Sequence, residues 1–184
     1  MSLWSILLFI ALVAMPATAQ EYTYTPIAGT HGLIPISLDS GWMYLERDAR
    51  EPAGVDSVPA AAWERVTLPH TWNRYDATDA TPGYRRGASW YRRTLDVSAF
   101  PAGMRFVLAF EGANTVAEVW VNGRRAGGHV GGYVGFELDV TPLVRRDGPN
   151  DVLVRVDNTD DPELIPSHRS DFTIYGGLTR DVWL

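Results

Sequence analysis

The sequence predicts an all-β fold in which two sheets pack face to face as a β-sandwich with jelly-roll connections. Short runs of alternating apolar and polar residues recur along the chain of 184 residues, and turn residues separate them. Helical periodicity is hard to find, and an aromatic fraction of 11% suits pleated strands. Short strands joined by long connections, with few helices, favour a sandwich over a helical or mixed fold.

Three strands and two helical turns are expected along the chain outside its hairpin region. The strands are expected at 41–46, 90–97 and 105–110. The third of these runs is almost entirely apolar, which predicts a strand buried on both faces. Short helical turns are expected at 60–63 and from 141 onward, where Thr141 would be the N-cap and Pro142 the first helical residue, and the residues 147–150 would end the second turn.

The second half of the chain predicts a hairpin and two further strands. Residues 115–121 lead into Asn122-Gly123, and this dipeptide favours a type I′ turn because both of its residues tolerate positive φ. Residues 136–140 and 152–156 alternate between apolar and polar positions. Their apolar side chains should therefore face inward, with Arg155 pointing outward.

Composition excludes several classes of function. The net charge is −6 and all 16 basic residues are Arg, interspersed with acidic residues, so a nucleic-acid interface is not expected. The chain has no Cys, which excludes a disulfide scaffold, a thiolate nucleophile and a Cys-ligated zinc site. The four His residues show no metal-ligand spacing, and we interpret His70 and His129 as structural, with His129 bonded to a loop carbonyl.

The first 19 residues are expected to be a signal peptide. The apolar run 3–13 is too short to span a membrane comfortably, and Ala17-Thr18-Ala19 fits a signal-peptidase site. Cleavage after Ala19 would leave a mature domain at 20–184, located in the periplasm or secreted. No basic residue precedes the apolar run, so an uncleaved anchor is the alternative. No stable membrane insertion of the mature domain is expected.

The last residues, 179–184, have the pattern of an apolar strand, and no turn or cap follows them. We therefore expect the chain to be a fragment, truncated near its last strand. Val182, Trp183 and Leu184 should then form part of a strand with incomplete partners, an open apolar edge that promotes association.

Five segments carry a resemblance to a known family. They are, in order, 66–73 (VTLPHTWN), 87–93, 110–141, 150–158 and 171–184. Their order and spacing resemble the sugar-binding domain that opens glycoside hydrolases of family 2, which include β-galactosidases, β-glucuronidases and β-mannosidases. The resemblance implies a galactose-binding-domain-like sandwich. It also implies an accessory role in a secreted, β-galactosidase-like retaining β-glycosidase that hydrolyses O-glycosidic bonds.

The resemblance also implies where the chemistry of such an enzyme takes place. Retaining glycosidases need two carboxyl groups about 5 to 5.5 Å apart, and in this family both belong to a (β/α)₈ barrel that follows the sandwich. The sequence here does not alternate between strands and helices as a barrel does. No catalytic residue is assigned, and Glu111 and Glu118 are placed in the scaffold. The expected partners are a carbohydrate substrate and the C-terminal domains of the same enzyme.

Three residues are candidates for substrate binding through the resemblance. Asp171 matches a position that in β-galactosidases contacts a sugar hydroxyl and helps to hold a sodium ion shared with the barrel; no other cofactor or metal is expected. Tyr84 and Arg85 lie in the run 76–87, which resembles a loop facing the pocket. A carboxylate accepts hydrogen bonds from hydroxyl groups, which suits Asp171. The alternative role for Asp171 is to stabilise a turn at a strand start.

Two other functions remain open from the sequence. A free-standing lectin-like module would bind sugar without any further domain. A small hydrolase with a carboxylate pair inside this chain would turn over substrate by itself.

Overall fold

The computed structural model describes residues 32–80, 83–164 and 173–184. The chain divides into two units, Met1–Ile34 and Pro35–Leu184, and every helix and strand described below belongs to the second. The predicted signal peptide and Asp171 lie outside the described residues. Within those described residues, no helix is long and apolar enough to cross a membrane.

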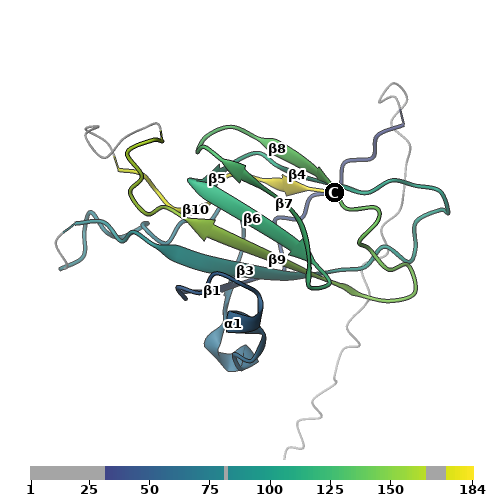
Figure 1. Cartoon of the computed structure of the whole chain (residues 1–184), viewed down its shortest axis with the longest axis horizontal. Coiled ribbons are helices and arrows are strands. Elements are labelled where there is room, and N and C mark those ends of the chain that lie inside the picture. The colour runs from purple at the N-terminus through teal and green to yellow at the C-terminus, as the bar shows by residue number, and fades with distance from the viewer. Residues whose placement is uncertain (1–31, 81–82, 165–172) are drawn as a thin grey trace, which may run out of the picture. The chain divides into compact units, whose positions relative to one another are not determined.

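The second unit is built from antiparallel sheets, which confirms the predicted sandwich (Figure 1). The larger sheet has six strands in the order β2-β1-β3-β9-β6-β7. Their bounds are Trp42–Leu45 for β1, Glu64–Val66 for β2, Ala88–Leu95 for β3, Val116–Val121 for β6, Arg124–Val130 for β7 and Asn150–Asp157 for β9.

The opposing layer consists of a three-stranded sheet in the order β11-β4-β8 and a pair, β10 with β5. The bounds are Val107–Phe110 for β4, Ala113–Asn114 for β5, Phe136–Asp139 for β8, Gly177–Leu178 for β10 and Val182–Trp183 for β11.

The main core lies between these two layers. Alternate residues of the six-stranded sheet point into it, among them Tyr91 and Val154, each with 0% of its surface exposed. The opposing layer contributes Leu108, Phe110 and Val182 to the same cluster. Each such side chain stabilises the fold by roughly 1.5 to 3 kcal/mol through its burial. The period-two pattern that predicted the strands is therefore the pattern that fills this core.

A second, smaller core covers the outer face of the six-stranded sheet. Trp90 and Trp120 lie there with their ring centroids 5.3 Å apart. The short helix α1, at Ala53–Asp56, closes this core from outside through Val55, and a second short helix, η1 at Ala60–Ala62, leads into Trp63, which also belongs to the core. The second confirms the helical turn expected at 60–63. The first was not predicted, because its four residues (Ala-Gly-Val-Asp) carry no helical periodicity.

The hairpin prediction is confirmed at Asn122 and Gly123. Their φ values are 52° and 73°, so both residues have the positive φ that a type I′ turn requires. The Asn122 side chain donates to Leu143 O at 2.9 Å and accepts from Asp151 N at 3.0 Å. The turn thus joins β6 to β7 and is also bonded to the rest of the fold.

Two details of the predicted pattern are wrong, and a third is incomplete. In β4 only Leu108 and Phe110 are buried while Val107 and Ala109 are half-buried, so the strand has one core face rather than two. Arg155 points away from the main core, as predicted, but it is only 9% exposed: the chain at Ala49 covers it, and its Nε donates to Ala49 O at 2.9 Å. At the expected second helix, Thr141 Oγ1 instead accepts from Phe106 N at 2.8 Å. Residues 141–143 form a turn there.

The expectation of an unpaired final strand is also wrong. One edge of β11 pairs with β4. On the other edge, Ile36 and Leu184 exchange two backbone hydrogen bonds of 2.9 Å, and Leu38 N donates to Val182 O at 2.7 Å. The returning segment 36–38 therefore covers the edge that the sequence pattern left open.

Candidate functional site

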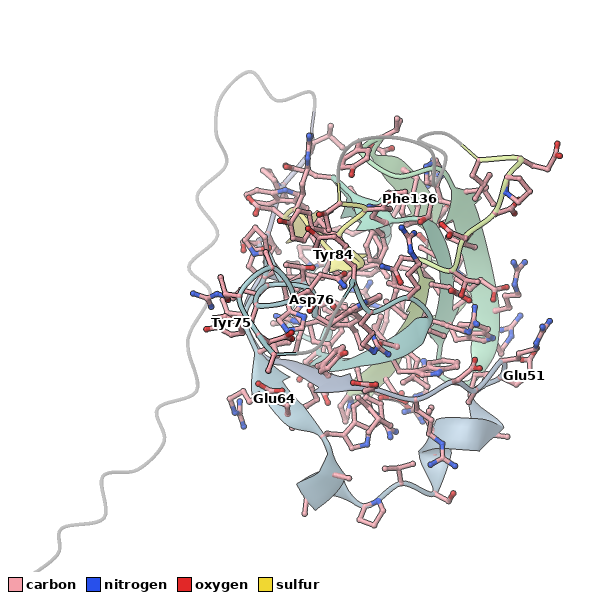
Figure 2. The ribbon with its side chains drawn as sticks, turned by 90° about the vertical axis from the view of Figure 1, so that its left-hand side faces the viewer. Glu51, Glu64, Tyr75, Asp76, Tyr84 and Phe136 are labelled. Atoms are coloured by element: carbon pink, nitrogen blue, oxygen red, sulfur yellow. The ribbon has the colours of Figure 1, made fainter. Side chains whose placement is uncertain are left out.

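The loops that could meet a ligand leave the six-stranded sheet at one end. Ala88 and Val116 both pair with Asp157, and Val116 also pairs with Val130, so β3, β6, β7 and β9 begin or finish at the same level. We call this region the loop end. Its described residues are 70–80, 83–87, 131–135, 158–164 and 173–176, which extend to the left in Figure 1 and face the viewer in Figure 2.

Two asparagines, each only 1% exposed, hold the loop end together. The Asn73 side chain donates to Asp76 Oδ2 at 2.7 Å and to Arg85 O at 2.8 Å. Its Oδ1 accepts from Gly176 N at 2.7 Å. Asn73 therefore ties the loop backbone at Arg85 and at Gly176, together with the Asp76 carboxylate, to one buried side chain.

Asn158 completes the same network from the far side. Its Oδ1 accepts from Gly87 N at 3.0 Å, and its Nδ2 donates to Ile174 O at 3.1 Å and to Arg85 O at 3.2 Å. Amide side chains suit this place because each can donate and accept at the same time. The network fixes residues 85–87 against residues 174–176.

Gly176 lets the loop 173–176 pack closely against the Trp72 ring. A Cβ on Gly176 would fall 2.0 Å from Cζ2 of Trp72, so only glycine fits there. Trp72 stacks on Tyr44 at a centroid distance of 6.3 Å, and the Arg85 guanidinium lies 4.9 Å from the Trp72 ring. Close packing and the asparagine network therefore act on the same stretch of backbone.

The predicted residues Tyr84 and Arg85 are neighbours with different environments. Tyr84 is 43% exposed and lies near Tyr75 and Asp76 in the view onto the loop end (Figure 2). Arg85 forms an ion pair with Glu46 at 2.9 Å and donates to Ser89 Oγ at 3.0 Å. Tyr84 is free to meet a ligand, whereas most of the Arg85 guanidinium is engaged within the fold. The ligand contacts of both, and of Asp171, remain predictions.

Beneath the loop end lies a buried group of titratable side chains. The His70 ring accepts from or donates to the Tyr91 hydroxyl at 2.8 Å, which confirms its structural role. Burial lowers the pKa of His70, and burial raises the pKa values of Tyr91 and Tyr44. All three are thus neutral at pH 7, which suits hydrogen bonding rather than proton transfer.

His129 differs from the prediction that it bonds a loop carbonyl. Its ring stacks on Phe136 with a centroid distance of 4.7 Å and an interplanar angle of 10°. Its Nε2 is buried and has no hydrogen-bond partner among the described residues.

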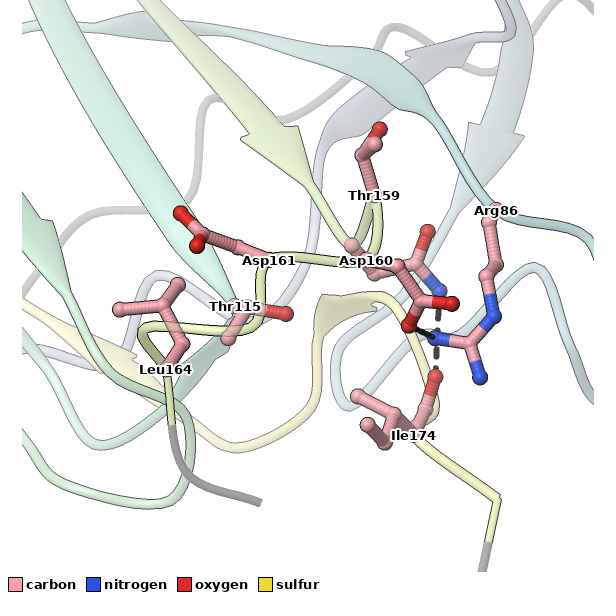
Figure 3. Close-up of a pocket in the computed structure, with 8 residues that line it drawn as sticks. Arg86, Thr115, Thr159, Asp160, Asp161, Leu164 and Ile174 are labelled. Carbon is pink, nitrogen blue, oxygen red and sulfur yellow. Dashed lines mark hydrogen bonds and ion pairs between the residues drawn. The ribbon is translucent and has the colours of Figure 1, made fainter. Parts of the chain in front are cut away.

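A small polar pocket opens at the loop end (Figure 3). Its volume is about 10 Å³, room for a single water molecule. Arg86 and Asp160 form an ion pair of 2.7 Å at its rim. Small-molecule sites usually need about 300 to 1,000 Å³. This pocket is therefore too small to enclose a sugar ring. The lining residues are Arg86, Thr115, Asn158, Thr159, Asp160, Asp161, Leu164 and Ile174.

The carboxylates considered for catalysis have scaffold contacts. Glu118 on β6 forms an ion pair with Arg125 at 3.2 Å, and Glu111 accepts from Trp183 Nε1 at 2.8 Å. Among the described residues, no group of three His, Asp or Glu side chains could hold a metal ion. The sodium ion that the resemblance implies depends on Asp171, so it stays a prediction.

The family model for the sugar-binding domain of family 2 glycosyl hydrolases matches residues 33–184. The chain belongs to this family. A Formosa agariphila protein provisionally named a β-glucuronidase is 49% identical to this family 2 domain over 148 residues, covering 80% of this chain and 18% of that protein. The β-galactosidase of Thermoanaerobacter pseudethanolicus is 32% identical over 151 residues, with coverages of 81% and 20%.

Solved structures agree with these relatives. The crystal structure of a Bacteroides uniformis β-glucuronidase matches this family 2 domain with a TM-score of 0.70 and 34% identity. The match covers 82% of this chain and 17% of that one. The family 2 domain described here thus spans about a fifth of the length of the relatives that it matches.

Sequence reasoning missed the residues that build the loop end of this family 2 domain. Asn73 and Asn158 lie within the segments 66–73 and 150–158, but no local sequence pattern shows that their side chains meet. The exposed rings of Tyr75, Tyr133 and Tyr175 were also not singled out; they are 63%, 45% and 42% exposed. A useful signal was available, since a polar residue at the end of an apolar strand, as in Val156-Asp157-Asn158, often anchors the next loop.

Proposed function

We propose that this chain is the sugar-binding domain of a β-glycosidase and that its loop end forms one wall of the substrate pocket. The proposal rests on how the loop end is built. Buried asparagines fix its backbone at 85–87 and 174–176, and tyrosine side chains remain exposed beside these stretches. A rigid loop that presents aromatic rings suits a sugar, because a ring face packs on the C–H face of a pyranose while the hydroxyl reaches water.

The small volume of the pocket in Figure 3 supports a wall rather than a complete site. A ligand pocket buries most of its ligand, and about 10 Å³ cannot do so. We therefore propose that a second surface, the catalytic domain of the same enzyme, completes the pocket. That domain would supply the two carboxyl groups about 5 to 5.5 Å apart that a retaining mechanism needs.

Relatives named as β-glucuronidases and β-galactosidases support β-glycosides as the substrate class. Two relatives named as β-glucuronidases are 49% and 41% identical to this chain, two named as β-galactosidases are 32% and 34% identical, and two other β-glucuronidases are 26% and 27% identical. The two highest of these identities are therefore to β-glucuronidases. We propose β-glucuronides ahead of β-galactosides for this reason. Sodium binding through Asp171 and substrate contacts of Tyr84 and Arg85 belong to the same proposal.

A chimaera tests the proposal. Residues 35–184 would replace the matching domain of the Bacteroides uniformis β-glucuronidase, and kcat and KM would be measured on aryl β-glucuronides and β-galactosides. Tyr84→Ala should raise KM about tenfold, the effect of losing one ring contact worth about 1.4 kcal/mol. The control is Arg124→Ala, an exposed residue of the hairpin at the opposite end of the sheet. Equal KM values in the two variants would contradict the proposed wall.

Export is proposed as well, on the apolar run 3–13 and the site at Ala17-Thr18-Ala19. Mass spectrometry of protein from the periplasm or the medium should show Gln20 as the first residue. An intact first segment on membrane-bound protein would instead support the anchor.

A further inference from the structure

A buried amide at the loop end lacks one of its hydrogen bonds. Asn114, on β5, is 0% exposed. Its Nδ2 donates to Tyr175 O at 2.7 Å, which fixes the orientation of the amide. Its Oδ1 is buried and has no partner among the described residues. Nearly all buried polar atoms in folded proteins are paired, so this oxygen calls for an explanation.

The loop 131–135 covers that oxygen. A Cβ on Gly132 would lie only 1.9 Å from Asn114 Oδ1, so the backbone of Gly132 rests directly on the amide. The C–H of Gly132 is a far weaker donor than N–H or O–H. The cover therefore shields the oxygen from water without replacing the hydrogen bond that water would give.

The covering loop has few attachments and an exposed tip. Gly131 N donates to Thr115 O at 2.9 Å. Beyond it, Tyr133 and Val134 are 45% and 61% exposed. The φ values of Gly131 and Tyr133 are 120° and 70°, a region that non-glycine residues such as Tyr rarely occupy. The closed loop thus carries an unpaired oxygen beneath it and a disfavoured conformation at Tyr133, and lifting it relieves both.

We propose that the loop 131–135 is a movable cap over a sugar contact, and that a ligand hydroxyl donates to Asn114 Oδ1 when the cap lifts. The class of ligand rests on the proposed function. An amide oxygen accepts from hydroxyl groups, which a pyranose offers in several directions. The hydrogen bond from Asn114 to Tyr175 keeps that oxygen facing the cap. Tyr175, which is 42% exposed, lies beside it through this bond to its backbone carbonyl.

Gly132→Ala tests the cap, because the added methyl group cannot fit while the loop is closed. Gly148→Ala is the matched control, since a Cβ on Gly148 meets nothing within 4 Å. Amide hydrogen exchange of 131–135 should be at least tenfold faster in Gly132→Ala than in wild type and unchanged in the control. If the loop 131–135 is closed in about nine of ten wild-type molecules, Gly132→Ala should also bind methyl β-glucuronide or methyl β-galactoside about tenfold more tightly than wild type.

A second measurement remains informative if Gly132→Ala does not fold. In the wild-type chain, the side-chain NH₂ resonances of Asn114 should shift when either glycoside is added, because donation to Oδ1 polarises the amide. Shifts at Tyr84 and Gly87 without any at Asn114 would overturn the cap and leave the proposed function standing. Shifts at none of these residues would overturn the cap, and the chimaera would then decide the proposed function. Unchanged exchange and affinity in a folded Gly132→Ala would also overturn the cap.

Discussion

Replacing Asn158 by Ala should destabilise the domain by more than the loss of so small a side chain suggests. The side chain is 1% exposed and bonds Gly87 N at 3.0 Å and Ile174 O at 3.1 Å. Arg85 O keeps its hydrogen bond from Asn73, at 2.8 Å, after the change. Two backbone groups therefore lose a partner, at about 1 to 3 kcal/mol each. Allowing for water that enters the space, we expect a loss of about 3 kcal/mol.

Thermal and urea unfolding followed by circular dichroism would measure this loss. For a domain of this length, about 3 kcal/mol corresponds to a fall in Tm of roughly 6 to 12 °C. The control is Asp160→Ala, which removes the exposed end of a 2.7 Å ion pair with Arg86. Such a surface pair contributes at most about 1 kcal/mol. If Asn158→Ala loses no more stability than this control, the asparagine network does not hold the loops.

Three further predictions concern the core, the acid stability and the chemistry. Trp90→Ala should cost about 3 to 5 kcal/mol in urea unfolding, because Trp90 is 0% exposed and packs on Trp120; a loss below 1 kcal/mol would contradict the second core. Hydrogen bonds from Thr141 and Arg105 lower the pKa of Asp139 from 3.8 to about 2, so its contribution to stability is present above pH 3.8 and is lost as the pH falls through about 2. An NMR titration of Asp139 with a midpoint near 4 would refute this. The purified chain should not hydrolyse aryl β-glycosides, and turnover abolished by one Glu→Gln change within it would contradict that expectation.

Local sequence patterns predicted the turns and strands whose conformation depends mainly on their own residues. The Asn122-Gly123 turn needs only the positive φ of its own two residues, and it forms as expected. The alternating run in β9 needs only a core on one side, and Val152, Val154 and Val156 all point into it. The fold class followed from such runs together with the motifs that resemble family 2.

Local sequence patterns did not predict contacts between residues that are far apart in the chain. The alternating pattern places Arg155 on the outward face, but a segment more than 100 positions earlier covers it, and Arg155 donates to Ala49 O of that segment. The sequence predicts a final strand with incomplete partners, but the backbones of Ile36 and Leu38 form hydrogen bonds with it. At the loop end, Asn73 and Asn158 lie 85 residues apart, and only the fold shows that they share one network.

The central claim is that sugar meets this domain at the loop end. The most direct measurement is a ¹H–¹⁵N NMR titration of the isotope-labelled chain with methyl β-glucuronide and methyl β-galactoside, with methyl α-mannoside as the control sugar. The account predicts saturable shifts for the β-glycosides that concentrate in residues 72–80, 83–87 and 173–176, with little change at the Asn122-Gly123 hairpin. Shifts that concentrate at that hairpin or on the outer face around Trp63 would contradict it, as would equal shifts with the control sugar.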